Sequence, residues 1–488
     1  MPFSRCARHP ADRTATSGTA GWPGVAAVLR EGRRGPSPLP NPPLYPPRDP
    51  RCDGRTAGRI RPRRQLQFRM QSTTLYQQIL GLSAPWRVVN VDLNLPGKSV
   101  QVRVEHDGSC PHQCPQCGQT CPGYDSGERS WRHLDTCQMQ TVLTAQVPRV
   151  RCPEHGVRLV QVPWAEPNGR FTALFEALVI EWLKVATIKA VATRMNLSWD
   201  QVDGIMSRAV QRGLDRRVPV EVRRVGVDET SFQKRHEYVT VVTNMDDGTV
   251  LHVADDRKAQ TLGAWYQTLG SDGLARLSVV AMDMWAPYIA ATRQHVPDAD
   301  QRIVFDKFHV AKHLGEAVDK VRRKEHRELK AADDDRLTGT KYLWQTNPDT
   351  LGKRPIPPEL LARFETLRSG TLRTARAYAL KEAAMEIWDD TSRPEATASW
   401  KWWHGWAVRS QLEPIKRVAG MIKSHLTGIL NAIVTGTTNA ISESVNAKIQ
   451  KVKRMACGFR NRDRFRSAIY FHLGGLDLYP QGVTHSNS

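Results

Sequence analysis

Apolar and polar positions in the middle of the chain follow a pattern that predicts a mixed sheet. Apolar residues surround Gly226, and Asp228 follows them at once, which indicates a short buried strand that ends in an acid. Two more strands come next, and then helical spacing alternates with apolar runs. The elements are expected at residues 224–228, 238–243, 249–253, 260–269, 277–282, 287–295 and 302–305. Their order is βββαβαβ.

This order predicts that two acids lie close together. A parallel strand that returns through a right-handed crossover tends to lie beside the strand it left, so the fourth strand is expected next to the first. Asp228 and Asp283 would then occupy neighbouring strand positions. Two carboxylates held near each other repel, and a divalent cation between them removes the repulsion. The layout is that of a ribonuclease-H-like core with a metal site.

A third acid is expected from a later helix that packs across the sheet. The best candidate is Glu443, which lies where a turn rich in Gly, Thr and Asn gives way to a basic helix. Asp306 is the rival for the second acid, but Asp283 is preferred because its strand is the one expected beside the first. His309, one helical turn beyond Asp306, is expected either to orient a carboxylate or to be an ordinary helical histidine.

The segment between Asp306 and Glu443 has helical spacing and is interpreted as an insertion that leaves the sheet intact. Helices are expected over residues 308–330 and 359–388, with a break at 347–358. Exposed tryptophans can stack on bases, but a buried helical core is the more common fate of such residues, and we expect it here. The tryptophans concerned are Trp400, Trp402, Trp403 and Trp406.

Two tight pairs of metal-binding residues precede the sheet. The sequences Cys114-Pro-Gln-Cys117 and Cys152-Pro-Glu-His155 are each followed by glycine. Two ligands two residues apart can grip one tetrahedral zinc ion, and two such pairs supply all four ligands. Strand-like pieces at 130–134 and 140–145 lie between the pairs, so a zinc ribbon is predicted. Competing ligands in the same region are Cys110, His112, Cys121, His133 and Cys137.

A helical segment follows the predicted ribbon. Residues 171–186 are apolar at helical spacing, which is typical of a helix with one buried face. The residues of this stripe are Leu174, Leu178, Trp182 and Val185. A short helix capped by Thr187 is expected next.

The short helix, a tight turn at residues 196–198 and a second helix fit a helix-turn-helix. Val202, Ile205 and Met206 would face inward from the second helix. Trp199, Gln201 and Arg208 would face outward, toward DNA. Any helical hairpin would bury the same apolar residues, so a hairpin without DNA contact is the alternative.

The charge of the chain indicates a polyanionic partner. Its 488 residues carry a net charge of +21, and the isoelectric point is near 9.8. A basic run after Glu443 predicts contact with DNA phosphates, through Lys448, Lys451, Lys453, Arg454 and Arg460. The sequence contains no run of eighteen apolar residues, so no transmembrane helix is predicted. The nine cysteines lack the spacing of a disulfide framework and suit a reducing compartment.

The first 69 residues differ from the rest. They contain 14 arginines, no lysine, 4 acidic residues and 12 of the 31 prolines, so they supply about +10 of the charge by subtraction and could not build a core. We expect a disordered leader upstream of a true start at Met70, or a basic arm that touches nucleic acid. The chain is then divided into this leader (1–69), a zinc ribbon (70–165), a helix-turn-helix (166–220), the first part of a catalytic core (221–310), a helical insertion (311–435) and the final part of the core with a basic helix (436–488).

From about Met70 to Gly475, the chain resembles the transposases of bacterial insertion sequences of the ISL type, a branch of the DDE superfamily. The motifs that carry the resemblance are Cys114-x-x-Cys117 with Cys152-Pro-x-His155, Val225-Gly-Val-Asp228-Glu, Asp283-Met-Trp-x-x-Tyr288, Val304-Phe-Asp-Lys-Phe-His309-Val, Ser442-Glu443-Ser-x-Asn446 and Gly458-Phe-Arg-Asn461. The pair Cys152-x-x-His155 departs from the more familiar second C-x-x-C, and the leader has no place in the family pattern.

The resemblance implies an α+β multidomain enzyme that binds the terminal inverted repeats of an insertion sequence. It assigns the catalytic acids to Asp228, Asp283 and Glu443, which would hold two Mg²⁺ or Mn²⁺ ions for cleavage and strand transfer. It further implies a structural zinc ion, double-stranded DNA as partner, at least a dimer on that DNA, and a place in the cytoplasm at the bacterial nucleoid. The alternatives are a catalytically inactive DNA-binding regulator and a metal-dependent nuclease without strand transfer.

Overall fold

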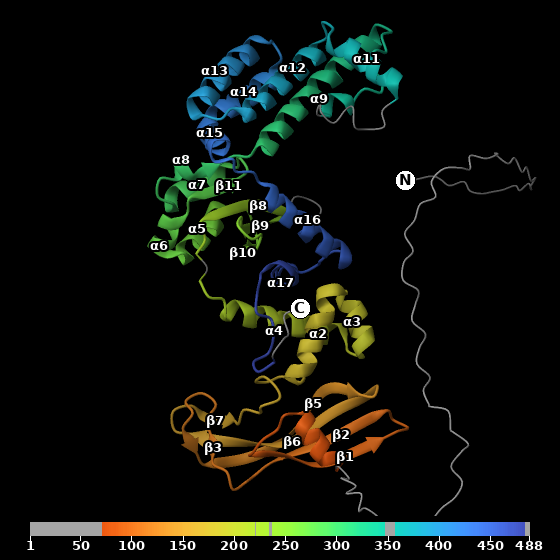
Figure 1. Ribbon diagram of the computed structural model, residues 1–488, viewed down its shortest axis with the longest axis vertical. Helices are drawn as coiled ribbons and strands as arrows, with labels where there is room; N and C mark the ends of the chain where they lie inside the picture. The colour runs from red at the N-terminus through yellow and green to blue at the C-terminus, as the bar shows by residue number, and fades with distance from the viewer. Residues whose placement is uncertain (1–70, 220, 234–236, 347–356, 484–488) are drawn as a thin grey trace, which may run out of the picture. The chain divides into compact units, whose positions relative to one another are not determined.

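The computed structural model describes residues 71–219, 221–233, 237–346 and 357–483 (Figure 1). The leader expected at 1–69, with its two interpretations, lies outside these residues. The described chain contains a sheet, a three-helix segment, a second sheet, a set of packed helices and two closing helices. In these ranges, no helix has the length and apolar character that crossing a membrane would need.

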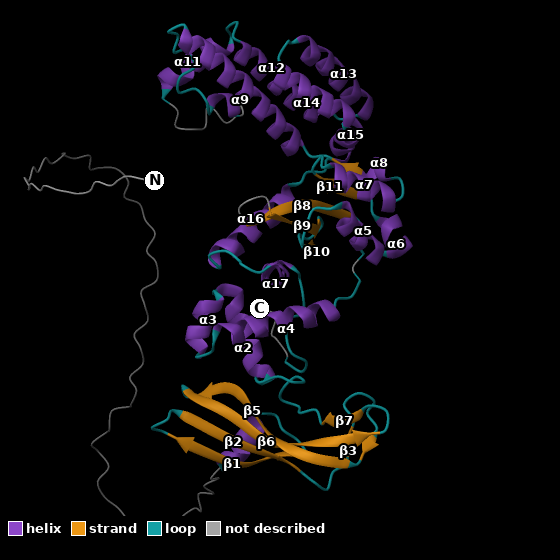
Figure 2. Ribbon diagram, turned by 180° about the vertical axis from the view of Figure 1, so that it is seen from behind, coloured by secondary structure: helices purple, strands orange, loops and turns teal. Residues whose placement is uncertain are grey.

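The first sheet is larger than the sequence predicted. Its strands are β1 (Trp86–Asn94), β2 (Ser99–His106), β5 (Gly123–Thr136), β6 (Met139–Cys152) and β7 (Gly156–Leu159), and it is preceded by helix α1 (Ser72–Ile79). The long strands have the order β1-β2-β6-β5, with β2 and β6 parallel. Figure 2 shows this sheet in orange. Pieces at 130–134 and 140–145 were predicted, but the first eight residues of β5 are all exposed and polar or small, so no alternation marks them.

Two short strands at one end of this sheet position the cysteine pairs. β3 (His112–Gln113) and β4 (Thr120–Cys121) form a two-stranded hairpin, and the turn between them contains Cys114 and Cys117. The second pair lies at the end of β6 and in the turn before β7. The two pairs therefore come from separate turns that meet beside the sheet.

The helical segment contains α2 (Ala173–Val185), α3 (Ile188–Met195) and α4 (Trp199–Asp215). The Thr187 side chain caps α3, and Val202, Ile205 and Met206 are buried, as predicted. The predicted buried stripe of α2 is wrong, because these side chains are 37–73% exposed: Leu174, Leu178, Trp182 and Val185. The opposite face of α2, including Phe175, Ile180 and Leu183, packs into the core instead.

The second sheet has the strand order β10-β9-β8-β11-β12. Its strands are β8 (Arg224–Gln233), β9 (Glu237–Asn244), β10 (Val250–Ala254), β11 (Val279–Met282) and β12 (Ile303–Val304). The first three are antiparallel, and β11 lies parallel to both β8 and β12, which confirms the predicted neighbours. β8 continues five residues beyond Asp228, so this acid lies within the strand rather than at its end.

Short helices connect the strands of this sheet. They are α5 (Ala259–Thr268), α6 (Gly270–Arg276), α7 (Ala286–His295) and α8 (Ala299–Arg302). α5 and α7 were predicted, whereas α6 and α8, of seven and four residues, were not. α5 and α7 pack on each other and cover one face of the sheet through Leu262, Tyr266 and Ile289.

A set of helices separates β12 from the end of the chain. It contains α9 (Lys307–Ala331), η1 (Leu343–Gln345), α11 (Pro358–Arg368), α12 (Arg373–Glu386), η2 (Ile387–Asp389), α13 (Arg393–Arg409), α14 (Glu413–Ser424) and α15 (Leu426–Thr435). Figure 1 shows α9 alongside α12 and α14, with which it packs. The helix expected at 359–388 is interrupted between α11 and α12, and most of the expected break at 347–358 lies outside the described residues.

The tryptophan cluster in α13 is divided between core and surface. Trp400 and Trp403 are fully buried, as expected. Trp402 is 64% exposed, and it contacts the half-buried Trp406 one turn away. The expectation of a buried core therefore holds for only part of the cluster.

Two closing helices return to the second sheet. α16 (Ala440–Met455) packs on β8, and α17 (Arg462–Leu473) packs on β10 and α4. The approach of α16 depends on Gly226, because a Cβ placed there would lie 2.1 Å from Oγ of Ser442. A glycine at this strand position therefore lets the helix that carries Glu443 lie directly against β8.

Candidate active site

Asp228 and Asp283 are adjacent across two parallel strands. Met282 of β11 pairs with Val227 of β8, and the next residue of each chain segment is the acid. Both side chains are half-buried. The pKa of Asp228 is raised to about 6, first by burial and then by the negative charges of Asp283 and Glu229, although its hydrogen bond from the Glu229 N–H and the neighbouring His309 oppose the rise.

His309 lies among the three predicted acids. Its Nδ1 is 3.5 Å from Oδ1 of Asp283. Its positive charge, when protonated, acts to lower the pKa of both Asp228 and Glu443. The ring is buried, and its Nε2 has no hydrogen-bond partner in the described part of the chain. One histidine at the start of α9 is therefore within electrostatic reach of all three carboxylates.

Asn446 contacts the first acid, which the sequence analysis did not foresee. Its Nδ2 donates a hydrogen bond of 2.7 Å to Oδ2 of Asp228, while Oδ1 of Asp228 accepts from the backbone N–H of Glu229 over 2.7 Å. Oδ1 of Asn446 is buried and has no partner among the described residues. One feature of the sequence indicated that Asn446 could lie near the acids: it follows Glu443 by three residues and so shares its helix face.

Glu443 lies in the first turn of α16 and is exposed. Its pKa is raised by partial burial and by the charge of Asp306, and His309 opposes this. Asp306 itself is buried, and its Oδ2 accepts a hydrogen bond of 2.7 Å from the backbone N–H of Asn439, the residue that precedes α16. Asp306 thus fixes the start of the helix that carries Glu443, whereas Asp283 lies beside Asp228.

The side chains around Asp228 and Asp283 fit a divalent cation. Carboxylate oxygens are the ligands that Mg²⁺ and Mn²⁺ prefer. The raised pKa values of Asp228 and Glu443, to which neighbouring acids contribute, indicate negative charge that a cation would neutralise. The unpartnered amide oxygen of Asn446 adds a further buried acceptor. The three acids do not form a closely gathered ligand group of the kind that the cysteines below form, among the residues described.

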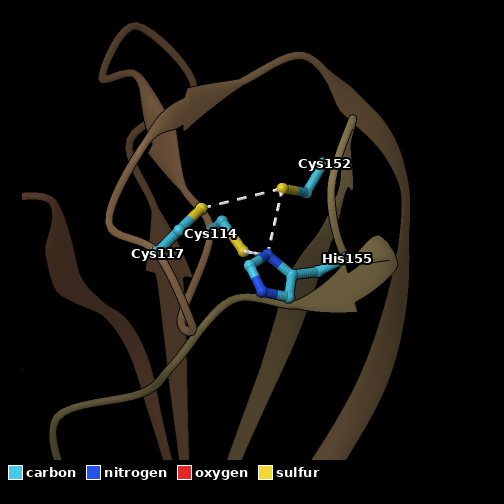
Figure 3. A group of neighbouring side chains, drawn as sticks. All are labelled: Cys114, Cys117, Cys152 and His155. Carbon is cyan, nitrogen blue, oxygen red and sulfur yellow. Dashed lines mark hydrogen bonds between the residues drawn. The ribbon is translucent and has the colours of Figure 1, made fainter.

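The second candidate metal site is the group of Cys114, Cys117, Cys152 and His155, whose ligand atoms all lie within 4.8 Å of one another (Figure 3). Sγ of Cys117 and Sγ of Cys152 are 3.7 Å apart, and Nδ1 of His155 is 3.5 Å from Sγ of Cys152 and 3.8 Å from Sγ of Cys114. Around one tetrahedral zinc, bond lengths of about 2.3 Å to sulfur and about 2.0 Å to nitrogen would separate such atoms by about 3.5–3.8 Å.

The competing ligands do not enter this group. Cys110, His112, His133 and Cys137 are outside it, and His133 instead hydrogen-bonds Thr172 through Nδ1 over 2.9 Å. Cys121 is buried beside the group, but its Sγ donates to the backbone carbonyl of Gln119. Burial opposes ionisation of Cys152, yet hydrogen bonds from the backbone N–H groups of His155 and Glu154 and from neighbouring thiols lower its pKa to about 7. A thiolate at neutral pH is the form that binds zinc.

The predicted DNA-reading side chains of α4 make contacts within the chain. Gln201 forms a capping box with Ser198 at the start of the helix. The guanidinium of Arg464, from α17, lies 4.4 Å from the ring centroid of Trp199. Arg208 forms an ion pair with the buried Glu176 of α2. Their contact with DNA stays a prediction.

The basic residues that follow Glu443 differ in their surroundings. Nζ of Lys453 donates to the backbone carbonyl of Ser231 over 2.7 Å, and burial lowers its pKa, so this residue fastens α16 to β8. The other residues predicted to contact DNA are exposed: Lys448, Lys451, Arg454 and Arg460. They place several positive charges on and just beyond the helix that carries the third acid.

Comparison with protein families identifies three segments of the chain. Residues 225–469 match the DDE transposase model of the ISL3 family. Residues 160–210 match the helix-turn-helix domain of transposase family ISL3. Residues 110–155 match the zinc finger of the transposases of IS204, IS1001, IS1096 and IS1165.

Curated relatives agree with these matches. The transposase for insertion sequence element IS1557 of Mycobacterium tuberculosis is 30% identical over 440 residues, which cover 83% of this chain and 96% of the relative. The transposase for insertion sequence element IS1001 of Bordetella parapertussis is 26% identical over 357 residues, which cover 72% of this chain and 86% of the relative. The chain therefore belongs to the ISL3 family of DDE transposases, enzymes that use divalent Mg²⁺ or Mn²⁺ to cut and join DNA and that carry a structural zinc ion and a DNA-binding helix-turn-helix.

Proposed function

We propose that Asp228, Asp283 and Glu443 hold two Mg²⁺ or Mn²⁺ ions at which the ends of an insertion sequence are cut and joined to target DNA. The observation that carries this assignment is the pairing of β8 with β11, which sets the first two acids side by side. Glu443 is linked to the same site through His309. The direct test replaces each acid by its carboxamide and asks whether cutting is lost while DNA binding is kept.

The roles of the surrounding residues follow from their contacts. Bound ions would activate the attacking water in cleavage and the freed 3′ hydroxyl of the DNA in strand transfer, and would neutralise charge on the leaving 3′ oxygen. Asp228 lies next to Asp283 and receives the hydrogen bond of Asn446, which holds its carboxylate toward α16. His309 orients Asp283 through Nδ1, which supports its role as a positioning residue. Asp306 anchors the first turn of α16 and is not proposed as a metal ligand.

The core is proposed to be ribonuclease-H-like. Three antiparallel strands followed by two parallel strands, in the order β10-β9-β8-β11-β12, support this assignment. The helices from α9 to α15 are proposed to be an insertion between the last strand and α16. The first part of the core is proposed to span residues 221–310, the insertion residues 311–435, and the final part of the core residues 436–488.

The N-terminal parts are proposed to recognise the terminal inverted repeats. A zinc ribbon at 70–165, with Cys114, Cys117, Cys152 and His155 as ligands, and a helix-turn-helix at 166–220 would read the repeat. The exposed lysines and arginines on and just beyond α16 would contact the phosphates beside the scissile bond. Two element ends require at least a dimer, which would act on DNA at the bacterial nucleoid.

A further inference from the structure

Helix α9 carries acidic residues on the face that contacts α12 and basic residues on another face. The carboxylate of Glu325 accepts hydrogen bonds from the backbone N–H groups of Arg373 and Thr374, over 2.8 and 2.7 Å, at the start of α12. Glu328 forms an ion pair with the Arg373 side chain. Glu325 and Glu328 therefore bind the start of α12, although the charge of Glu328 also acts on Arg327.

Basic side chains gather along that other face. A shallow groove of about 470 Å³ is lined by Arg322, Arg323, His326, Arg327, Lys330 and Ala331. The buried Arg322 is held by Asp319 over 2.8 Å, and the same carboxylate pairs with the exposed Arg323 over 2.9 Å. Arg327 and Lys330 are exposed and form no ion pair within 4.0 Å with any residue that the structure describes. Five basic side chains thus line one open groove, and Asp319 pairs with two of them, Arg322 and Arg323.

A run of charged residues on a helix usually forms a solvent-exposed face. Here the position of the groove relative to the proposed metal ligands indicates a binding role. α9 begins beside the proposed metal ligands, where His309 contacts Asp283. At a rise of about 1.5 Å per residue, the segment from Arg323 to Lys330 lies about 21–32 Å from His309 along the helix axis. Base pairs of B-form DNA are spaced about 3.4 Å apart, so on a duplex that runs along α9 the groove lies about six to nine base pairs from His309.

We propose that the groove on α9 binds the phosphate backbone of duplex DNA about six to nine base pairs from the scissile phosphate. The inference rests on the proposed function, because the count starts at the site of Asp228 and Asp283. Arg323, Arg327 and Lys330 contact the phosphates, and Arg322 is positioned by Asp319 to support them. Contacts of this kind fix the path of the duplex and carry no sequence information.

The test measures the affinity of the full chain, without divalent metal, for duplexes that carry the element's terminal repeat and end at increasing distances on either side of the cleavage site. The variant Arg323→Ala, Arg327→Ala, Lys330→Ala removes three charges from the groove. The control variant Lys401→Ala, Arg417→Ala, Lys423→Ala removes three charges from exposed positions on α13 and α14. Both variants have the same net charge, so a difference between them reports on position.

Wild type and control should gain affinity when DNA on one side is lengthened from about 3 to about 12 base pairs, and the groove variant should not gain. Because three phosphate contacts are lost, the ratio of the wild-type affinity to that of the groove variant should fall about 40-fold between 50 and 200 mM salt. The inference is overturned if the groove variant gains affinity as wild type does, or if it is weaker by one constant factor at all lengths. Failure of the proposed function would appear separately, as cutting by Asp228→Asn.

Discussion

Asn446 donates a hydrogen bond from Nδ2 to Oδ2 of Asp228 over 2.7 Å, and it stands one helical turn beyond Glu443 on α16. The same helix therefore carries the third acid and a direct contact to the first. Gln450, one further turn along, donates to Oγ1 of Thr230 over 2.8 Å. α16 is thus fastened to β8 by these two contacts and by that of Lys453 with Ser231, and of the three only that of Asn446 reaches a proposed catalytic acid.

Replacement of Asn446 should weaken catalysis more than replacement of Gln450. Asn446→Ala leaves Oδ2 of Asp228 without its donor, and loss of such a supporting contact typically costs about 10- to 100-fold in activity. Gln450→Ala removes an equivalent contact away from the acids, so it should cut DNA at close to the wild-type rate. The measurement is the rate of cleavage of a terminal-repeat duplex at saturating Mg²⁺. Equal losses in the two variants would show that Asn446 only holds the helix.

A methyl group at position 226 should displace α16. In Gly226→Ala the new Cβ would lie 2.1 Å from Oγ of Ser442, whose Cβ is 3.4 Å away. We expect cleavage to fall sharply while binding to the repeat persists, because overpacking costs about 1–3 kcal/mol and moves Glu443. The double variant with Ser442→Ala removes the clashing oxygen and should restore much of the activity. Failure of this rescue would contradict the close approach of helix and strand.

Zinc content should follow the four proposed ligands. Wild type is expected to carry one zinc ion per chain, and Cys117→Ser should lose it together with repeat binding, since the two turns are no longer held together. Cys110→Ser is the matched control, because Cys110 lies in the same region but outside the group. Elemental analysis after gel filtration measures the zinc. Loss of zinc from Cys110→Ser with retention in Cys117→Ser would reverse the ligand assignment.

The buried His133 should make stability depend on pH. Burial lowers its pKa to about 4, from 6.5 in the unfolded chain, and the nearby Arg132 adds to this. The unfolded state then binds more protons between these values, so stability is present above pH 6.5 and is lost as pH falls. A shift of this size removes about 2 kcal/mol between pH 7 and pH 5. Urea unfolding of wild type and His133→Gln at both pH values tests this, and an equal pH effect in the two proteins would contradict it.

The strand order of the central sheet could be predicted because the apolar pattern locates the strands and the connections between them limit how they can pair. Apolar strands joined by short turns gave the meander, and the handedness of crossovers placed β11 beside β8. Asp228 and Asp283 could therefore be paired from sequence. The continuation of β8 past Asp228 was missed because Glu229 and Ser231 interrupt the apolar run.

Burial on α2 could not be predicted, because apolar residues occur on more than one side of this helix. Leu174 and Trp182 form as good a stripe as Phe175 and Leu183, and only the packing against the rest of the core selects between them. The spacing of Asn446 from Glu443 places both on one helix face, but the contact of Asn446 with Asp228 also depends on how closely α16 approaches the strand. Sequence periodicity indicates which faces of a helix could be buried, and tertiary packing determines which face is buried and what it contacts.

Cleavage by carboxamide variants tests the catalytic assignment most directly. The full chain is incubated with Mg²⁺ and a labelled duplex that carries the terminal repeat, and cutting and binding are measured for Asp228→Asn, Asp283→Asn, Glu443→Gln and Asp306→Asn. The first three should bind as wild type does and fail to cut, while Asp306→Asn should retain residual cutting because Asp306 anchors α16 without holding metal. Cutting by Asp283→Asn together with complete loss in Asp306→Asn would contradict the account.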